Sequence, residues 1–224
     1  MKMYPSFNEV FASDDLLGIF YPLCSNGHGL HFVSSNGLWM DEQYETEHNT
    51  FSYVQFKIKN GKYDFKGDIR LYKGYEYARK IFPILEEDFN VNGSDYLAEK
   101  MKPALYIKKI IKTLPPQLQN DIDLDYYLNT FYEFSINKLS YSLHGDFGVF
   151  NHLIKGYRKL DTSPIIYNEK EHGGNPMDDH IIKGYSHIGA VVGYEFFTDG
   201  NNTVLFYNEN ENKVLSANHY SWNI

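Results

Sequence analysis

The sequence is poor in cysteine, in arginine and in long apolar runs. Its only cysteine, Cys24, excludes an intrachain disulfide and a cysteine-based metal cage, and it favours a reducing compartment. No run approaches the ~20 apolar residues that span a bilayer, so no membrane association is expected. Acid and proline within residues 1–9, where a signal peptide needs an apolar core, predict a cytoplasmic protein.

Internal repeats and low-complexity linkers are also lacking, which argues against solenoids and propellers. The 224 residues fit one domain, because domains usually hold roughly 100–200 residues. We therefore predict a single α+β domain over residues 1–224, with possible subdomains at 1–73, 74–143 and 144–224.

Aromatic residues and acids are what the chain has in excess. With 20 Tyr and 16 Phe it is too aromatic to be disordered. The formal net charge of −8 disfavours binding to nucleic acid, whose phosphates an acidic surface repels. Three arginines among 21 basic residues, with abundant Asn, Ile and Tyr, indicate an AT-rich, bacterial genome.

The first zone, residues 1–73, is predicted to be mostly β structure. Apolar and polar residues alternate over 51–58, and Asn60-Gly61 supplies the positive φ angles of a tight hairpin that returns through Tyr63 and Phe65. A second hairpin is expected between residues 30–33 and 38–40, around a Ser-Ser-Asn-Gly turn.

The second zone, residues 74–143, is predicted to be helical. Apolar residues recur at three- and four-residue spacing over 75–85, where Pro83 predicts a kink or an early stop. Ser94 is expected to cap a second segment, and Pro103 fits the first turn of a separate helix. After a break at Pro115-Pro116, a third helix opens at Asp123 or Asp125. It is apolar on more than one face and is therefore expected to be central.

The third zone, residues 144–224, returns to β structure. The near-continuous apolar run 188–197 predicts a strand covered on both faces, followed by strands over 203–207 and 214–217. The fold class is therefore α+β, with an antiparallel β N-terminal zone, a central helical zone and a C-terminal antiparallel β meander. Whether the two β zones share one sheet stays open at this point.

One motif suggests an enzyme. Residues 144–151 read His-Gly-Asp-Phe-Gly-Val-Phe-Asn, which fits H-x-D-x-x-x-x-N and resembles the catalytic loop of aminoglycoside-phosphotransferase-like kinases. The resemblance implies that Asp146 positions the acceptor hydroxyl and Asn151 binds Mg²⁺, with His144 opening the loop. Only these eight residues carry it, and no glycine-rich phosphate loop precedes them. The alternative interpretation is a helix end closed by Gly145.

Two further clusters offer weaker chemistry. Cys24, with His28 and His31 behind it, suggests a thiolate nucleophile or a buried cysteine below a polar loop. His and Asp residues within 172–187 suggest a second alternative, a metal-dependent hydrolase, although their spacing matches no recognised metal motif. The same residues are typical of an exposed loop, and no metal ligand is assigned.

Because no catalytic set is complete, the favoured interpretation is not an enzyme but a small acidic protein-binding module without a cofactor. An immunity-type inhibitor of a bacterial toxin fits that class. Its partner would be another protein, basic in charge, and the oligomeric state stays open. The proposed contact residues are the acids Asp41, Glu42, Glu45 and Glu47, with exposed tyrosines as anchors; a solvated loop is the alternative interpretation of this segment.

Overall fold

The computed structural model describes residues 2–145, 166–167, 184–191, 193, 196–198 and 202–219. It confirms the predicted α+β class, with antiparallel sheet at both ends of the sequence and helices between them. The longer helices are α2 (Tyr75–Ala98), α3 (Pro103–Ile110) and α4 (Leu124–His144). The short helices are α1 (Phe7–Val10) and the 3₁₀ turns η1 (Asp14–Leu16), η2 (Glu42–Tyr44), η3 (Ile69–Leu71) and η4 (Pro116–Gln119).

A small antiparallel sheet opens the chain. Its strand order is β1-β2-β3, and its strands are β1 (Lys2–Met3), β2 (Tyr21–Ser25) and β3 (His31–Ser34). All residues of β2 and β3 are buried, so this sheet is an inner layer.

The larger sheet joins the two β zones. Its order is β5-β4-β9-β8-β7-β6. The strands are β4 (Tyr53–Lys59), β5 (Lys62–Phe65), β6 (Ile166–Tyr167), β7 (Ser186–Val191), β8 (Asn202–Asn208) and β9 (Lys213–His219). Strand β4 pairs antiparallel with β9, with Gln55 opposite Leu215, which answers the question that the sequence left open. The predicted meander is confirmed by the β7-β8-β9 order.

The β4–β5 hairpin forms as predicted. Asn60 and Gly61 have φ angles of 53° and 76°, the left-handed values that a two-residue hairpin turn requires. Lys59 pairs with Lys62, and Phe56 pairs with Phe65.

The hairpin expected over residues 30–40 is wrong. Strand β3 pairs only with β2, and residues 38–40 turn away, so that Met40 forms an isolated bridge with Tyr72. The turn is held by helix α4 instead of by a return strand. Asn36 Nδ2 donates to Thr130 Oγ1 at 3.0 Å, and the Tyr126 hydroxyl donates to Asn36 Oδ1 at 2.8 Å.

An early stop at Pro83 and a separate segment capped by Ser94 are both wrong, because α2 continues through the two positions. Pro83 is exposed, so the carbonyl that loses its N–H donor lies on the solvent side. Ile81 and Leu85, on either side of it, are fully buried. Burial of this face outweighs the local preference against proline.

The other helix predictions are confirmed. Pro103 begins α3, and Asp123 is the N-cap of α4, where its side chain accepts a hydrogen bond from the Tyr126 N–H. Helix α4 is central, since it packs against α2, α3 and the small sheet.

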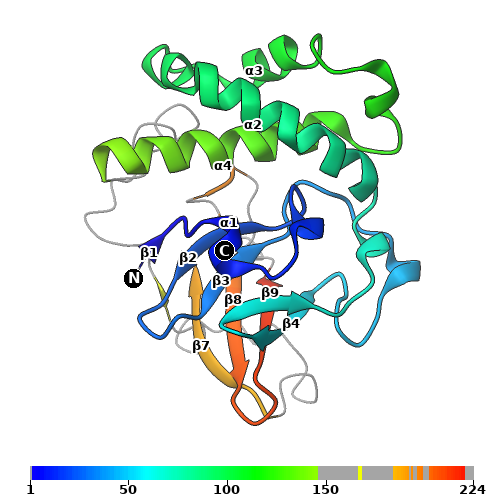
Figure 1. Cartoon of the computed structure of the whole chain (residues 1–224), viewed down its shortest axis with the longest axis vertical. Helices are drawn as coiled ribbons and strands as arrows, with labels where there is room; N and C mark the ends of the chain where they lie inside the picture. The colour runs from blue at the N-terminus through cyan, green and yellow to red at the C-terminus, as the bar shows by residue number, and fades with distance from the viewer. Residues whose placement is uncertain are drawn as a thin grey trace, which may run out of the picture.

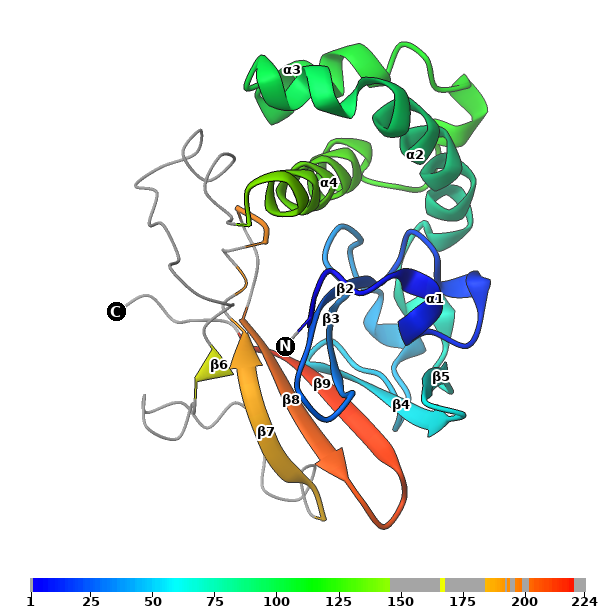
Figure 2. The same ribbon diagram turned by 60° about the vertical axis from the view of Figure 1, so that its left-hand side comes forward.

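The elements stack in layers, with α2 and α3 outermost, then α4, the small sheet and the large sheet (Figures 1 and 2). Tyr4 of the chain start packs edge-on against Phe134 of α4 at 5.4 Å between ring centroids. On the other side of the small sheet, the Ser216 hydroxyl of β9 donates to the Val33 carbonyl of β3 at 3.0 Å. Ring contacts such as that of Tyr4 with Phe134 show that aromatic side chains fill much of the space between α4 and the small sheet.

The strand predicted over 188–197 is too long, since β7 ends at Val191. Phe196 and Phe197 follow in a turn and are buried against α4 instead. Two buried polar side chains of α4 hold this turn. Asn137 Nδ2 donates to the Phe196 carbonyl at 3.0 Å, and the Thr198 N–H donates to Glu133 Oε2 at 2.7 Å.

Candidate functional site

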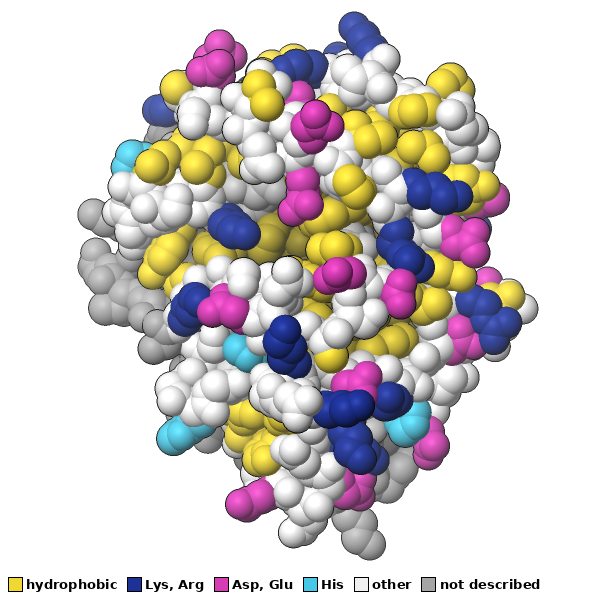
Figure 3. All heavy atoms as spheres, in the orientation of Figure 1, with side chains coloured by type: hydrophobic (Ala, Val, Ile, Leu, Met, Phe, Trp, Pro, Cys, Tyr) yellow, Lys and Arg dark blue, Asp and Glu magenta, His cyan; other side chains and the backbone are white. Residues whose placement is uncertain are grey.

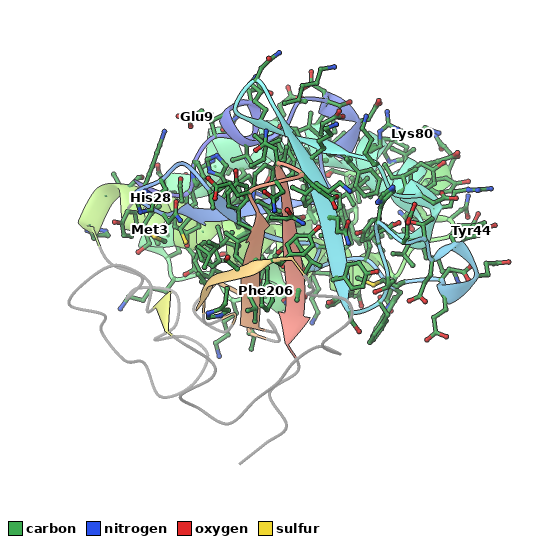
Figure 4. All side chains as sticks on the ribbon, turned by 90° about the horizontal axis from the view of Figure 1, so that it is seen from below. Met3, Glu9, His28, Tyr44, Lys80 and Phe206 are labelled. Carbon is green, nitrogen blue, oxygen red and sulfur yellow. The ribbon has the colours of Figure 1, made fainter. Side chains whose placement is uncertain are left out.

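The acidic segment 41–47 is an ordered loop built around η2. Asp41 caps η2: Gln43 donates to its carboxylate from the backbone N–H at 3.4 Å and from Nε2 at 2.7 Å. The Asp41 N–H donates to the Leu71 carbonyl at 2.8 Å, which ties the segment to η3. Figure 4 places Tyr44, the last residue of η2, at one edge of the molecule.

Hydrogen bonds below the segment fix the rest of the loop. Glu45 Oε1 accepts the Phe51 N–H at 2.6 Å. Asn49 is fully buried, and its amide exchanges two hydrogen bonds with the Asp68 backbone, at 2.8 and 3.0 Å. The loop therefore presents its carboxylates from a fixed backbone.

Those carboxylates are not neutralised by lysine or arginine. Among the described residues, no lysine or arginine lies within 4 Å of the carboxylates of Asp41, Glu42, Glu45 or Glu47. The one ion-pair contact is between Glu47 and His48, at 3.6 Å. The sequence prediction of an acidic contact segment thus corresponds to a surface with uncompensated negative charge.

Arg70 of η3 contacts the acidic segment at Tyr44, and its guanidinium is already engaged. It lies over the Tyr44 ring at 4.6 Å from the centroid and forms an ion pair with Asp68. The hydrogen bonds from Arg70 lower the pKa of the Asp68 carboxyl. The Arg70 guanidinium therefore binds Tyr44 and Asp68 and does not neutralise the acids of segment 41–47.

Two exposed aromatic residues flank the acidic segment. Five large hydrophobic side chains are exposed in the described part of the chain, and the two aromatic ones are Trp39, at 57%, and Phe51, at 41%. We call Trp39, Asp41, Glu42, Glu45, Glu47 and Phe51 together the acidic–aromatic surface. The sequence analysis identified the acids of this surface but missed both aromatic residues, although each aromatic lies within four positions of one of the acids.

Two hollows elsewhere have less specific linings. One, of about 620 Å³, opens between Asp15, Asp64 and Arg79, but its charges are paired: Arg79 with Asp15 at 2.7 Å, and Lys66 with Asp64 at 2.8 Å. The other, of about 300 Å³, lies where α2 crosses α4, with apolar rings below and one acid and one base beside it. Its rings are Phe82, Phe89, Phe131 and Phe134, and its charged side chains are Glu86 and Lys138. On the face of the molecule drawn in Figure 3, hydrophobic side chains lie at the floor of a hollow.

The kinase-like motif is described only at its start. His144 is the last residue of α4, and Gly145 ends the helix at φ 72° with its N–H donating to the Tyr141 carbonyl at 2.8 Å. The predicted glycine helix end is thus confirmed. Asp146 and Asn151 lie outside the described residues.

The nucleophile interpretation of Cys24 is not supported. Cys24 is fully buried in β2, and burial raises the pKa of its thiol to about 12. His28 is in an exposed turn at the opposite edge of the molecule from Tyr44 (Figure 4). His31 is buried in β3, where desolvation lowers its pKa and favours the neutral ring. Neither histidine has a hydrogen bond or ion pair with Cys24, and the buried-cysteine interpretation fits.

Thiol–disulfide exchange tests this directly, because Cys24 is the only thiol. At about pH 8 a thiol of pKa about 12 has on the order of 1,000-fold less thiolate than an unperturbed one. We therefore expect the folded protein to react at least ~100-fold more slowly with a disulfide reagent than the same protein in guanidinium chloride. Equal rates in the two conditions would show that Cys24 is accessible.

The 172–187 cluster falls mostly outside the described residues. Only His187 is described: it lies half-buried in β7, with its ring 5.4 Å from that of Phe206. Across the described part of the chain, no three His, Cys, Asp or Glu side chains are grouped to hold a metal ion. In the same residues, no helix is both long and apolar enough to cross a membrane.

Comparison of the chain with known protein families, with curated proteins and with solved structures finds no match. The candidate site is therefore argued from its own chemistry. The acidic–aromatic surface combines exposed aromatic side chains, a fixed backbone and an excess of one charge, whereas the first hollow has paired charges and the second has one acid and one base.

Proposed function

We propose that this protein is a protein-binding module that uses the acidic–aromatic surface to bind a basic partner. The observation that carries the proposal is the placement of Trp39 and Phe51, the two exposed aromatics among the described residues, at either end of an acidic segment that has no lysine or arginine partner there. Aromatic side chains supply most of the energy at protein interfaces, and uncompensated charge increases the rate of association with an oppositely charged partner.

The form of this function that we favour is an immunity-type inhibitor of a toxic protein in a bacterial cytoplasm. Three features support it: the small size, the formal net charge of −8 and the exposed aromatic side chains. A protein encoded by the neighbouring gene is then the first partner to test.

The test uses the tagged full-length protein as bait against that gene product and against extract of the native host. In the test variant, Asp41→Asn, Glu42→Gln, Glu45→Gln and Glu47→Gln remove the charges. Each amide keeps one acceptor oxygen, which suffices for the shorter bond from Gln43 Nε2 and for the bond from the Phe51 N–H. We expect this variant to bind the partner ~10-fold or more weakly than the unmodified chain, and mainly through a slower association rate.

The matched control removes three exposed acids of α2 and its exposed C-cap acid by Glu76→Gln, Glu87→Gln, Asp95→Asn and Glu99→Gln. It has the same net charge as the test variant and should bind normally. Equal binding by both variants would contradict the proposal. Saturable binding of Mg²⁺–ATP that Asn151→Ala weakens would support the phosphotransferase alternative instead.

A further inference from the structure

The side chain of Trp39 is fixed in place although more than half of it is exposed. Its ring lies on Tyr126 of α4 with 5.1 Å between centroids and a 30° tilt. Its indole N–H donates to Asp123 Oδ2 at 3.2 Å. Its own carbonyl accepts the Lys73 N–H at 2.8 Å. One face of the indole is therefore supported, and 57% of the residue remains exposed.

The support beneath Trp39 is itself held from two sides. The Tyr126 hydroxyl donates to Asn36 Oδ1 at 2.8 Å, and the Tyr126 N–H donates to Asp123 Oδ1 at 3.4 Å. Asn36 is in turn bonded to Thr130, one helical turn further along α4. A rigid exposed aromatic loses little conformational entropy when a partner covers it, which is the property of an interface anchor.

One carboxylate contacts the indole, and three more acids are close to Trp39 or Asp123 in the sequence. Asp123 contacts the indole directly, Asp121 and Asp125 lie two positions to either side of Asp123, and Asp41 follows Trp39 by two positions. In the described chain none of these carboxylates has a lysine or arginine within ion-pair distance. The Lys73 N–H donates to the Trp39 carbonyl, and the four acids named above outnumber this base.

A second aromatic–carboxylate pair in this protein, Tyr44 with Asp68, shows which cation suits such a pair. There Arg70 lies over the Tyr44 ring while it pairs with Asp68. Trp39 with Asp123 repeats the aromatic ring and the carboxylate without the guanidinium. A planar guanidinium stacks on an indole and hydrogen-bonds to carboxylates at its edge, which a lysine ammonium does less well.

We infer that the Trp39–Asp123 pair is the binding site for an arginine side chain of the basic protein partner. This inference rests on the proposed function and specifies it: acids attract the partner, and Trp39 selects arginine over lysine.

The test uses two peptides of equal charge, one with alternating arginine and glycine and one with alternating lysine and glycine. The chain has two tryptophans, so Trp222→Phe leaves Trp39 as the only indole whose fluorescence reports binding. We expect saturable quenching by the arginine peptide and a dissociation constant ~2–5-fold lower than for the lysine peptide, as a cation–π contact at an exposed site provides.

Calorimetry then compares variants that keep the fold, which circular dichroism checks. Trp39→Ala should remove the preference for arginine, whereas Phe51→Ala, at the other exposed aromatic, should keep it. Asp123→Asn keeps an acceptor for the indole N–H and should weaken both peptides.

The outcomes separate the inference from the proposed function. Equal binding of both peptides, unchanged in Trp39→Ala, would overturn the arginine site and leave an acidic protein-binding surface. No binding of either peptide would also overturn the arginine site, while the bait experiment with charge-neutralised variants decides the proposed function independently.

Discussion

Replacing Phe56 by alanine is expected to lower the free energy of unfolding by about 3–5 kcal/mol, the usual loss for a buried phenylalanine. Phe56 is fully buried in β4. Its ring stacks on Tyr63 at 5.2 Å and meets Phe20 edge-on at 5.3 Å, so alanine leaves a cavity among rigid rings that cannot close around it. Urea denaturation followed by circular dichroism measures the change.

The matched control is Val91→Ala. Val91 lies on α2 with 75% of its surface exposed, so its truncation should change the free energy of unfolding by no more than about 0.5 kcal/mol. Because domains are usually stable by only about 5–15 kcal/mol, the Phe56 variant should unfold at a clearly lower urea concentration. A loss below about 1 kcal/mol for Phe56→Ala would show that the ring cluster repacks, contrary to our expectation.

The second large effect is expected at Glu133. Its carboxylate is buried in α4 and accepts hydrogen bonds from the N–H and the hydroxyl of Thr198. Glu133→Ala leaves the Thr198 N–H without this acceptor, and we expect a loss of about 2–3 kcal/mol in the free energy of unfolding. Glu133→Gln keeps one acceptor oxygen, and about half that loss is expected.

A double-mutant cycle with Thr198→Val isolates the contact between the two side chains. The valine removes the hydroxyl and keeps the backbone N–H. We expect the losses of unfolding free energy in Glu133→Ala and in Thr198→Val, added together, to exceed the loss in the double variant by about 1 kcal/mol. Strictly additive losses would mean that Glu133 stabilises the fold through groups other than the Thr198 hydroxyl.

Features set by nearby residues were predictable from the sequence. The Asn60-Gly61 turn, the Asp123 cap and the Gly145 helix end each depend on a few adjacent residues, and all three are confirmed. The α+β class followed from the order of such segments. Each of these depends on φ preference or on local hydrogen bonds, which the sequence displays directly.

Features set by distant contacts were not predictable. Pro83 stays within α2 because the apolar residues around it are buried by α4, and the 35–37 turn is held by Thr130 and Tyr126 instead of by a return strand. The pairing of β4 with β9 was equally hidden, because an apolar strand does not specify its partner.

The acidic–aromatic surface also has one part that was predictable from the sequence and one part that was not. Its acids were visible as a run between residues 41 and 47, but the position of Trp39 on Tyr126 depends on the contact between the first zone and α4. A tryptophan in sequence is more often a core residue, so only its exposure of 57% in the fold makes it a candidate anchor.

The pairing of β4 with β9 has a consequence for biosynthesis. Asn212 Nδ2 donates to the Ile58 carbonyl across 154 positions of the chain, and Ser216 reaches Val33 across 183. While the ribosome is still translating the helical zone, β4 has a free edge that awaits its neighbour. Closing such a long loop is slow, and the nascent polypeptide is then a natural client for chaperones that shield unpaired strands.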